Sequence, residues 1–259
     1  MFCGSCLNDN TLARALTQLG ADIQLVPTYT PIRTDEQDVS AERVFFGGIN
    51  VYLQQRFAPF RFLPGVLDRV LNHPRVIRWA TKRDVQADPE LLGAMTVSML
   101  KGDAGFQRKE QRRLLNFLEQ QRPHMVNFTN VLIAGSAPEI RRRLNVPVVV
   151  TLQGDDIFLD YIPQRFREAS IREIRRVCDH IDGFIVHSQF YGDYMTERLG
   201  LSREKGHIVP LGLDAADFSL PTPPPSAEPP YRLGYLARLT PEKGLHLLVD
   251  AFLILRQSR

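Results

Sequence analysis

The sequence has 259 residues, of which 44% are hydrophobic and 24% charged, proportions typical of a soluble globular protein with a sizeable core. A formal net charge of +3 is too small to indicate a polyanionic partner, so we expect no nucleic acid. The sequence has no apolar run of 18 residues and no charged start followed by an apolar segment, which favours a cytoplasmic location. Three cysteines, an odd number, argue against a disulfide scaffold.

The chain opens with a short loop of small residues and then an amphipathic pattern from Leu7 to Leu19, which predicts a helix. Its candidate N-caps are Asn8, Asp9 and Asn10, and Gly20 is its candidate C-cap. A strand is predicted next, over 22–26. A Rossmann-like domain normally has a strand before this helix, so we expect the first strand to be missing.

The opening loop contains the pattern Cys3-x-x-Cys6. A helix start lowers a thiol pKa, which is typical of thioredoxin-like redox sites. No second Cys or His pair completes a zinc site, so no metal is expected. We favour instead a small-residue loop that approaches a ligand, with Gly4 and Ser5 as its contacts, and leave the role of the two cysteines open.

The stretch 43–83 is rich in arginine and aromatic residues and contains one acid, Asp68. Such a stretch could contact an anionic membrane surface, a lipid-linked acceptor or nucleic acid. The other interpretation, which we favour, is a helical insertion whose aromatic side chains pack inward. If a membrane contact exists, we expect it to be peripheral, at the inner membrane face.

From Pro123 onward, short apolar runs alternate with amphipathic patterns, which predicts a doubly wound parallel α/β sheet. In such sheets, ligands bind beyond the carboxyl ends of the strands. The candidate ligand-binding residues after the strand ends are Asn127, Gln153, Gly154, Asp155 and Ser188. The predicted strands are 124–128, 147–152, 183–187 and 207–210, and the predicted helices are 133–144, 164–178 and 191–199.

The last part of the chain begins with a proline-rich linker, 219–230, and continues as a predicted strand (231–237), a loop and a helix that contains Leu245 and Phe252. Arg238 and Lys243 lie in the loop, and Gly244 follows them at the helix start. Two cations beside the exposed N–H groups of a helix N-terminus favour phosphate binding. The alternative is that both are solvated charges, with Glu242 as a partner.

Three motifs resemble family 4 glycosyltransferases, which are retaining enzymes of the GT-B fold. ARLTPEKG resembles their G-R-L-x-P-E-K-G signature, with Ala237 in place of the glycine. VVVTLQGDD resembles their T-x-H-G-x-D segment, in which the histidine faces the transferred sugar; Gln153 stands at that position and cannot titrate. Beside it, Asp155 and Asp156 could contact substrate or cap the next segment. HIVPLGLDAADF resembles the passage between the two domains.

The resemblance implies an N-terminal, acceptor-side Rossmann-like domain over 1–218, the linker 219–230, and the start of a donor-binding domain over 231–259. It further implies that the E-x7-E motif of the family would lie beyond Arg259. We therefore expect a fragment with low activity.

The activity implied is transfer of a sugar, with retention, from a nucleotide diphosphate sugar to an acceptor hydroxyl. Arg238 and Lys243 would neutralise the leaving diphosphate in place of a metal, and no cofactor is expected. The implied partners are the nucleotide sugar and an acceptor that is a glycan, a lipid or a small molecule. The alternatives are a non-catalytic sugar- or membrane-binding protein and a nucleotide-sugar epimerase or phosphorylase of the same fold.

Overall fold

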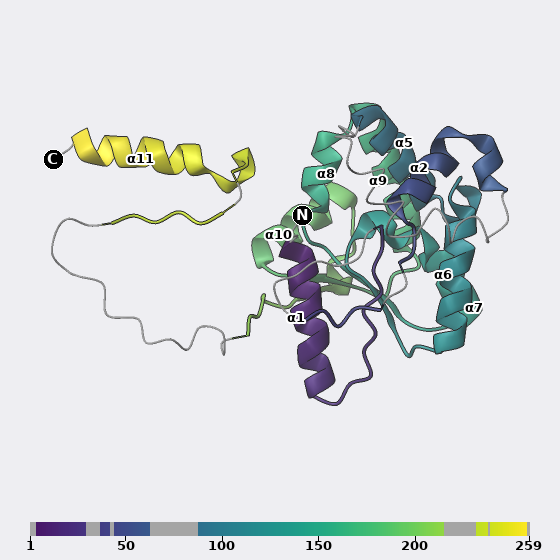
Figure 1. Cartoon of the computed structure of the whole chain (residues 1–259). Helices are drawn as coiled ribbons and strands as arrows, with labels where there is room; N and C mark the ends of the chain where they lie inside the picture. The colour runs from purple at the N-terminus through teal and green to yellow at the C-terminus, as the bar shows by residue number, and fades with distance from the viewer. Residues whose placement is uncertain are drawn as a thin grey trace. The chain divides into compact units, whose positions relative to one another are not determined.

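The computed structural model describes residues 4–29, 37–41, 44–62, 88–214, 232–237 and 239–257. The chain forms two compact units, Met1–Asp214 and Ala215–Arg259. The first unit is an α/β domain in which helices pack around a parallel sheet, as expected of a Rossmann-like domain of the GT-B type (Figure 1).

The sheet of the first unit has four strands in the order β1-β2-β3-β4, all parallel. They are β1 (Val126–Phe128), β2 (Val148–Thr151), β3 (Gly183–Val186) and β4 (Gly206–Ile208). Valine-rich strands that are buried on both faces suit a parallel sheet, and β2 reads Val-Val-Val-Thr. Each strand pairs with the next one in the sequence, so the carboxyl ends of all four meet at one edge.

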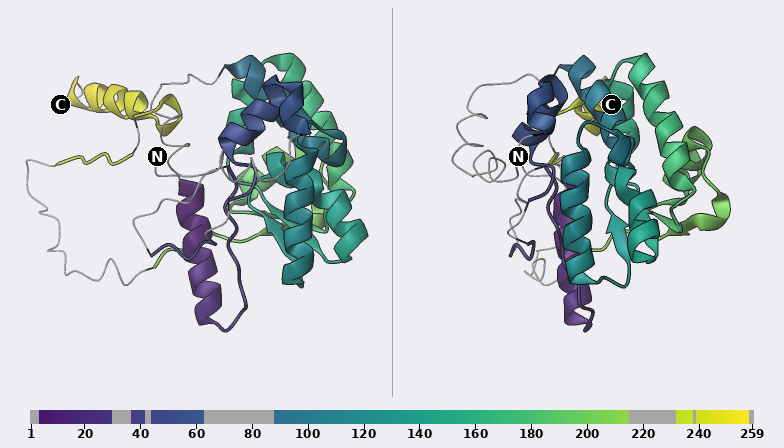
Figure 2. Two further views of the ribbon diagram at one scale, coloured as in Figure 1. Left: turned by 45° about the vertical axis from the view of Figure 1, so that its right-hand side comes forward. Right: turned by 90° about the vertical axis from the view of Figure 1, so that its right-hand side faces the viewer.

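The helices of the first unit lie between and before these strands, and Figure 2 shows α1 alongside the body of the other helices. The connections β1 to β2, β2 to β3 and β3 to β4 each contain helix, as parallel strands require. The α-helices are α1 (Gly4–Gln18), α2 (Gly48–Arg56), α5 (Pro89–Leu100), α6 (Arg108–Gln121), α7 (Ala137–Leu144), α8 (Asp155–Tyr161), α9 (Gln164–Cys178) and α10 (Gln189–Leu199). The 3₁₀ helices are η1 (Ala58–Arg61), η2 (Gly102–Ala104), η3 (Val131–Ser136) and η4 (Arg203–Lys205).

The core is closed by α5, which packs against α9 and η3. Two glycines allow this close approach. A Cβ at Gly93 would lie 2.6 Å from the Phe166 ring, and a Cβ at Gly135 would lie 2.1 Å from the backbone oxygen of Met99. Both distances are far below van der Waals contact, so these helices could not pack as they do with a larger residue at either position.

The N-terminal part differs from the sequence-based prediction in two ways. Helix α1 begins at Gly4, so Asp9 lies inside the helix and is not its N-cap. The strand predicted over 22–26 is reduced to a single parallel bridge between Leu25 and Ser40, and a second such bridge joins Thr28 and Phe45. Pro27 lies between the two bridges and has no N–H to donate, so a continuous ladder cannot form there.

The described part of the second unit consists of η6 (Pro241–Lys243) and α11 (Leu245–Gln257). Residues 232–237, which we predicted to form a strand, have no strand pairing. A strand is stabilised by its neighbours, and the described residues of this unit provide none. Helix α11 is apolar and has no buried residue.

None of the helices that the structure describes combines the length and the apolar character that a membrane crossing requires. The basic and aromatic stretch 43–83 is described only over 44–62. There, Phe45 and Phe46 are buried, while Phe57 and Phe62 are exposed. The inward packing that we favoured therefore holds for Phe45 and Phe46 and not for Phe57 and Phe62; Tyr52 is also exposed, and Phe60 is half-buried. The rest of this stretch lies outside the described residues.

Candidate functional site

A cluster of polar side chains lies at the carboxyl edge of the sheet. Its members are Asp9, Gln153, Asp155, Asp156, His187, Ser188 and Tyr191. The register pairs Thr151 of β2 with Ile185 of β3. Gln153 lies just beyond the end of β2 and His187 just beyond the end of β3, and both lie near Asp9. The amino end of α1 reaches this edge, because the Gln153 side chain is hydrogen-bonded to Asp9.

The contacts of Gln153 join three segments that are distant in the sequence. Its Nε2 donates to the Asp9 carboxylate at 2.8 Å and to the backbone oxygen of Thr129 at 3.2 Å. The Thr129 side chain is also hydrogen-bonded to Asp9. A helix, the loop after β1 and the loop after β2 are thereby fixed to one another through a half-buried amide.

Burial raises the pKa of Asp9 above its usual value. The hydrogen bonds from Gln153 and Thr129 and the nearby His187 act in the opposite direction and favour the carboxylate. Burial has the larger effect. A carboxylate at this position is therefore costly to maintain, and the donors around it reduce that cost.

Asp155 stabilises the two loops that carry the site. Its side chain is fully buried, and its two carboxylate oxygens accept from the backbone N–H groups of Val131 at 2.8 Å and Gln153 at 3.0 Å. Burial raises the pKa of Asp155 to about 6, against the lowering effect of these backbone hydrogen bonds. Asp155 thus ties together the loops after β1 and β2. It does not cap the next segment, because the N-cap of α8 is Gly154 and no side-chain cap hydrogen bond is present. Substrate contact by Asp155 stays a prediction.

Tyr191 of α10 holds the turn after β2. Its hydroxyl donates to Asp156 at 2.8 Å and accepts from the backbone N–H of Gly154 at 2.9 Å. Burial raises the pKa of Tyr191, and the hydrogen bond to Asp156 raises it further, so the phenol remains protonated. Gly154 has a φ of 82°, the left-handed conformation that favours glycine.

His187 and Ser188 follow β3 directly. His187 Nδ1 lies 2.8 Å from the backbone oxygen of Val209, which can only accept, so Nδ1 carries a proton. Its Nε2 is buried and has no hydrogen-bond partner within the described part of the chain. Ser188 caps α10 by accepting from the N–H of Tyr191 at 3.2 Å.

Three other candidates from the sequence, Asn127, Gly4 and Ser5, also lie in the first unit. Asn127 lies within β1 and exchanges hydrogen bonds with the Thr151 hydroxyl at 3.1 and 3.2 Å. Gly4 and Ser5 form the first turn of α1, and the contact with the loop after β2 comes from Asp9, further along the helix. A ligand contact for each of these residues stays a prediction.

The second unit carries the remaining candidates. Lys243 ends η6 and is exposed, and its backbone oxygen accepts from the Tyr235 hydroxyl at 3.1 Å. Gly244 follows with a φ of 70° and leads directly into α11. Arg238 lies outside the described residues. The role of the two cations therefore stays a prediction.

Three residues of the cluster did not enter the sequence-based list of candidates: Asp9, Tyr191 and His187. Asp9 was considered only as a helix cap, and its contact with Gln153 spans 144 residues. His187 was placed at the end of a predicted strand, a position that by itself marks a candidate in a parallel sheet. Tyr191 had no distinguishing sequence signal.

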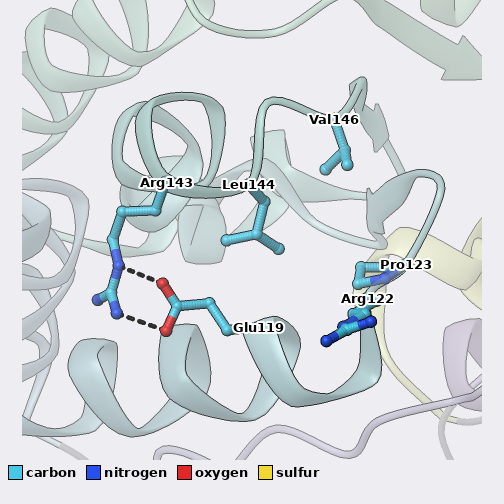
Figure 3. A pocket seen from close by; sticks show the side chains of 6 residues that line it. All are labelled: Glu119, Arg122, Pro123, Arg143, Leu144 and Val146. Atoms are coloured by element: carbon cyan, nitrogen blue, oxygen red, sulfur yellow. Dashed lines mark hydrogen bonds and ion pairs between the residues drawn. The ribbon is translucent and has the colours of Figure 1, made fainter.

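Figure 3 shows a pocket of about 220 Å³ that belongs to a different region. Pro123 precedes β1 and Val146 precedes β2, so the pocket lies by the amino ends of these strands, away from the cluster. Arg143 on its wall is paired with Glu119 at 2.7 Å. We therefore place the candidate site at the carboxyl edge.

No group of three or more metal-ligating side chains occurs among the residues that the structure describes. Cys6 is half-buried, whereas Cys3 lies outside the described residues.

Comparison with known proteins points to a family. The family model described as Glycosyltransferase Family 4 matches residues 93–217. This range contains all four strands and every member of the cluster except Asp9. No curated protein matches the chain.

Proposed function

We propose that this chain, which contains a Glycosyltransferase Family 4 domain over residues 93–217, transfers a sugar from a nucleotide diphosphate sugar to an acceptor hydroxyl with retention at the anomeric carbon. The family match is the observation that carries the proposal. A transferase of this kind must bind a polyhydroxylated ligand. The polar cluster at the carboxyl edge of the sheet is suited to that task, because it offers amide, hydroxyl and imidazole groups.

In this proposal Arg238 and Lys243 bind the diphosphate of the donor. Negative charge develops on the leaving diphosphate as the bond to the sugar breaks. Cations fixed beside that charge lower the barrier more than they stabilise the bound substrate. Support comes from the sequence motif and from the exposed position of Lys243 before α11. The nucleotide, the sugar and the acceptor class are left to experiment.

The proposal is tested by incubating the protein with a panel of nucleotide diphosphate sugars, with and without glycan and lipid acceptors, and measuring release of the nucleoside diphosphate. Lys243→Ala should lower the rate roughly 100-fold, the usual effect of removing one group that stabilises transition-state charge. Lys101→Ala removes an exposed lysine of the first unit and serves as the control. NMR of the product then shows whether the anomeric configuration is retained.

Three results would contradict this proposal or a part of it. Failure to release nucleoside diphosphate from any donor would favour a non-catalytic binding protein. Conversion of the sugar while it remains attached to the nucleotide would indicate an epimerase. Equal rates for Lys243→Ala and Lys101→Ala would remove Lys243 from the catalytic site.

A further inference from the structure

The orientation of the Gln153 carboxamide is set by its two partners. The backbone oxygen of Thr129 can only accept a hydrogen bond, and the Asp9 carboxylate likewise has only acceptors. Both lie within hydrogen-bond distance of one atom, at 3.2 and 2.8 Å. That atom must therefore be the NH₂ group of Gln153. The reversed amide would place the carbonyl Oε1 against two acceptors and lose both hydrogen bonds.

This orientation leaves the Oε1 atom of Gln153 as the free end of the amide. Within the part of the chain that the structure describes, Oε1 has no hydrogen-bond partner, and the side chain is only half-buried. Gln153 therefore presents an acceptor and no donor to a ligand. A histidine in the same position could present either.

Asp9 can fix the amide because the backbone beside it is itself anchored. The next residue, Asn10, is fully buried. Its Nδ2 donates to the backbone oxygen of Gln37 at 3.0 Å, and its Oδ1 accepts from the N–H of Val39 at 3.0 Å. These bonds hold this part of α1 in place, so the Asp9 carboxylate faces Gln153 from a rigid element.

We propose that Asp9 is a positioning residue of this site, which holds Gln153 with its carbonyl oxygen free to accept a hydrogen bond from a ligand hydroxyl. The ligand group opposite residue 153 must then be a donor, such as a sugar hydroxyl, and not a phosphate or carboxylate oxygen. Gln153 transfers no proton in this arrangement. The inference about the ligand rests on the proposed function, whereas the role of Asp9 does not.

The role of Asp9 is tested by NMR of the Gln153 side-chain NH₂ group, whose signals are assigned by their loss in Gln153→Glu. In the wild-type protein both protons should be shifted downfield and exchange slowly. Asp9→Ala should move them toward the values of an exposed amide. Asp9→Asn should keep them, because the Asn oxygen can accept from Gln153 while Thr129 still requires the NH₂ end. Asp22→Ala, an exposed acid beyond the end of the same helix, is the control.

Unchanged Gln153 signals in Asp9→Ala would overturn the proposal. An equal shift of the Gln153 signals in Asp9→Asn and in Asp9→Ala would also overturn the proposal. A purely electrostatic role of Asp9 would give that result. Methyl signals of the buried core report whether each variant is folded. If Asp9→Ala does not fold, Asp9→Asn still distinguishes a hydrogen-bonding role of Asp9 from a purely electrostatic one.

The ligand side is tested with UDP-glucose and its monofluorinated analogues as probes, using their dissociation constants. Fluorine cannot donate a hydrogen bond. One fluorinated position should therefore weaken binding roughly tenfold or more, and the same position should lose this discrimination in Asp9→Ala and in Gln153→Ala, which has no side-chain acceptor. Equal affinity for all analogues in the wild-type protein would overturn the assignment of a ligand hydroxyl. If no nucleotide sugar binds, the proposed function fails, while the amide signals still decide the role of Asp9.

Discussion

Asp155 is a buried acid whose titration should be visible in the stability of the protein. Burial raises its pKa from 3.8 to about 6. A carboxyl whose pKa is raised on folding contributes stability below its unfolded pKa and loses it as the pH rises through its folded pKa. Between pH 4 and pH 7, the free energy of unfolding of the wild type should therefore fall by about 3 kcal/mol relative to that of Asp155→Asn. Urea unfolding of both proteins at several pH values measures this difference.

An acid with the opposite shift provides the control. Asp160 is half-exposed, and its hydrogen bond to Arg198 lowers its pKa. Its contribution to stability is present above its unfolded pKa and lost as the pH falls. Asp160→Asn should therefore lose stability relative to the wild type at neutral pH and not in acid. Parallel pH profiles for Asp155→Asn and the wild type would show that Asp155 keeps an ordinary pKa.

At the scale of single residues, the sequence predicted positions in the site better than it predicted roles. Gln153 and Ser188 were identified because they follow strands, and the structure places both at the carboxyl edge. Their partners could not be predicted in the same way. The contact of Gln153 with Asp9 depends on how α1 packs beside the sheet, and no local pattern encodes a contact between residues so distant in the sequence.

At the scale of the elements, η3 and α5 approach each other very closely. Gly135 lies against α5, and a Cβ there would be 2.1 Å from the backbone oxygen of Met99. Backbone atoms cannot move aside as a flexible side chain can. Gly135→Ala should therefore force α5 away from η3 and lower the free energy of unfolding by about 2 kcal/mol, as overpacking commonly does. Thermal or urea unfolding measures the effect.

Gly212→Ala is the matched substitution, because a Cβ at Gly212 would meet no atom within 4 Å. It removes the same backbone freedom without a steric clash, so its stability should stay within about 0.5 kcal/mol of the wild type. Similar losses in both variants would attribute the effect to backbone conformation and contradict the packing argument.

The elements that the sequence predicted well are those with a strong local signal. Helix α9 has the predicted bounds, Gln164–Cys178, because charged and apolar residues alternate along it at helical spacing. Strand β2 was evident from its run of valines. The strand predicted over 231–237 was wrong for the described residues 232–237, since an apolar run forms a strand only with a partner to pair with.

At the scale of the whole molecule, the two units differ in what stabilises them. The first unit has a continuous buried core, whereas α11 in the second unit has no buried residue. Isolated helices of this length are marginal in water. Backbone amides of α11 should therefore exchange with deuterium much faster than those of β2 and β3, which should exchange only on global unfolding. Hydrogen exchange followed by mass spectrometry measures both sets in one experiment. Comparable protection of α11 and β2 would show that α11 is covered by an apolar partner.

The order of the strands also has a consequence for how the protein folds. Each strand of the sheet pairs with the strand that follows it in the chain, and the four strands span only residues 126–208. Pairing between strands that are neighbours in the sequence closes shorter loops than pairing between distant strands would, which lowers the entropic cost of forming the sheet. During synthesis, β1 and β2 can pair as soon as both have left the ribosome, and β3 and β4 then add in turn. The sheet can thus form strand by strand, in the order in which the strands are translated.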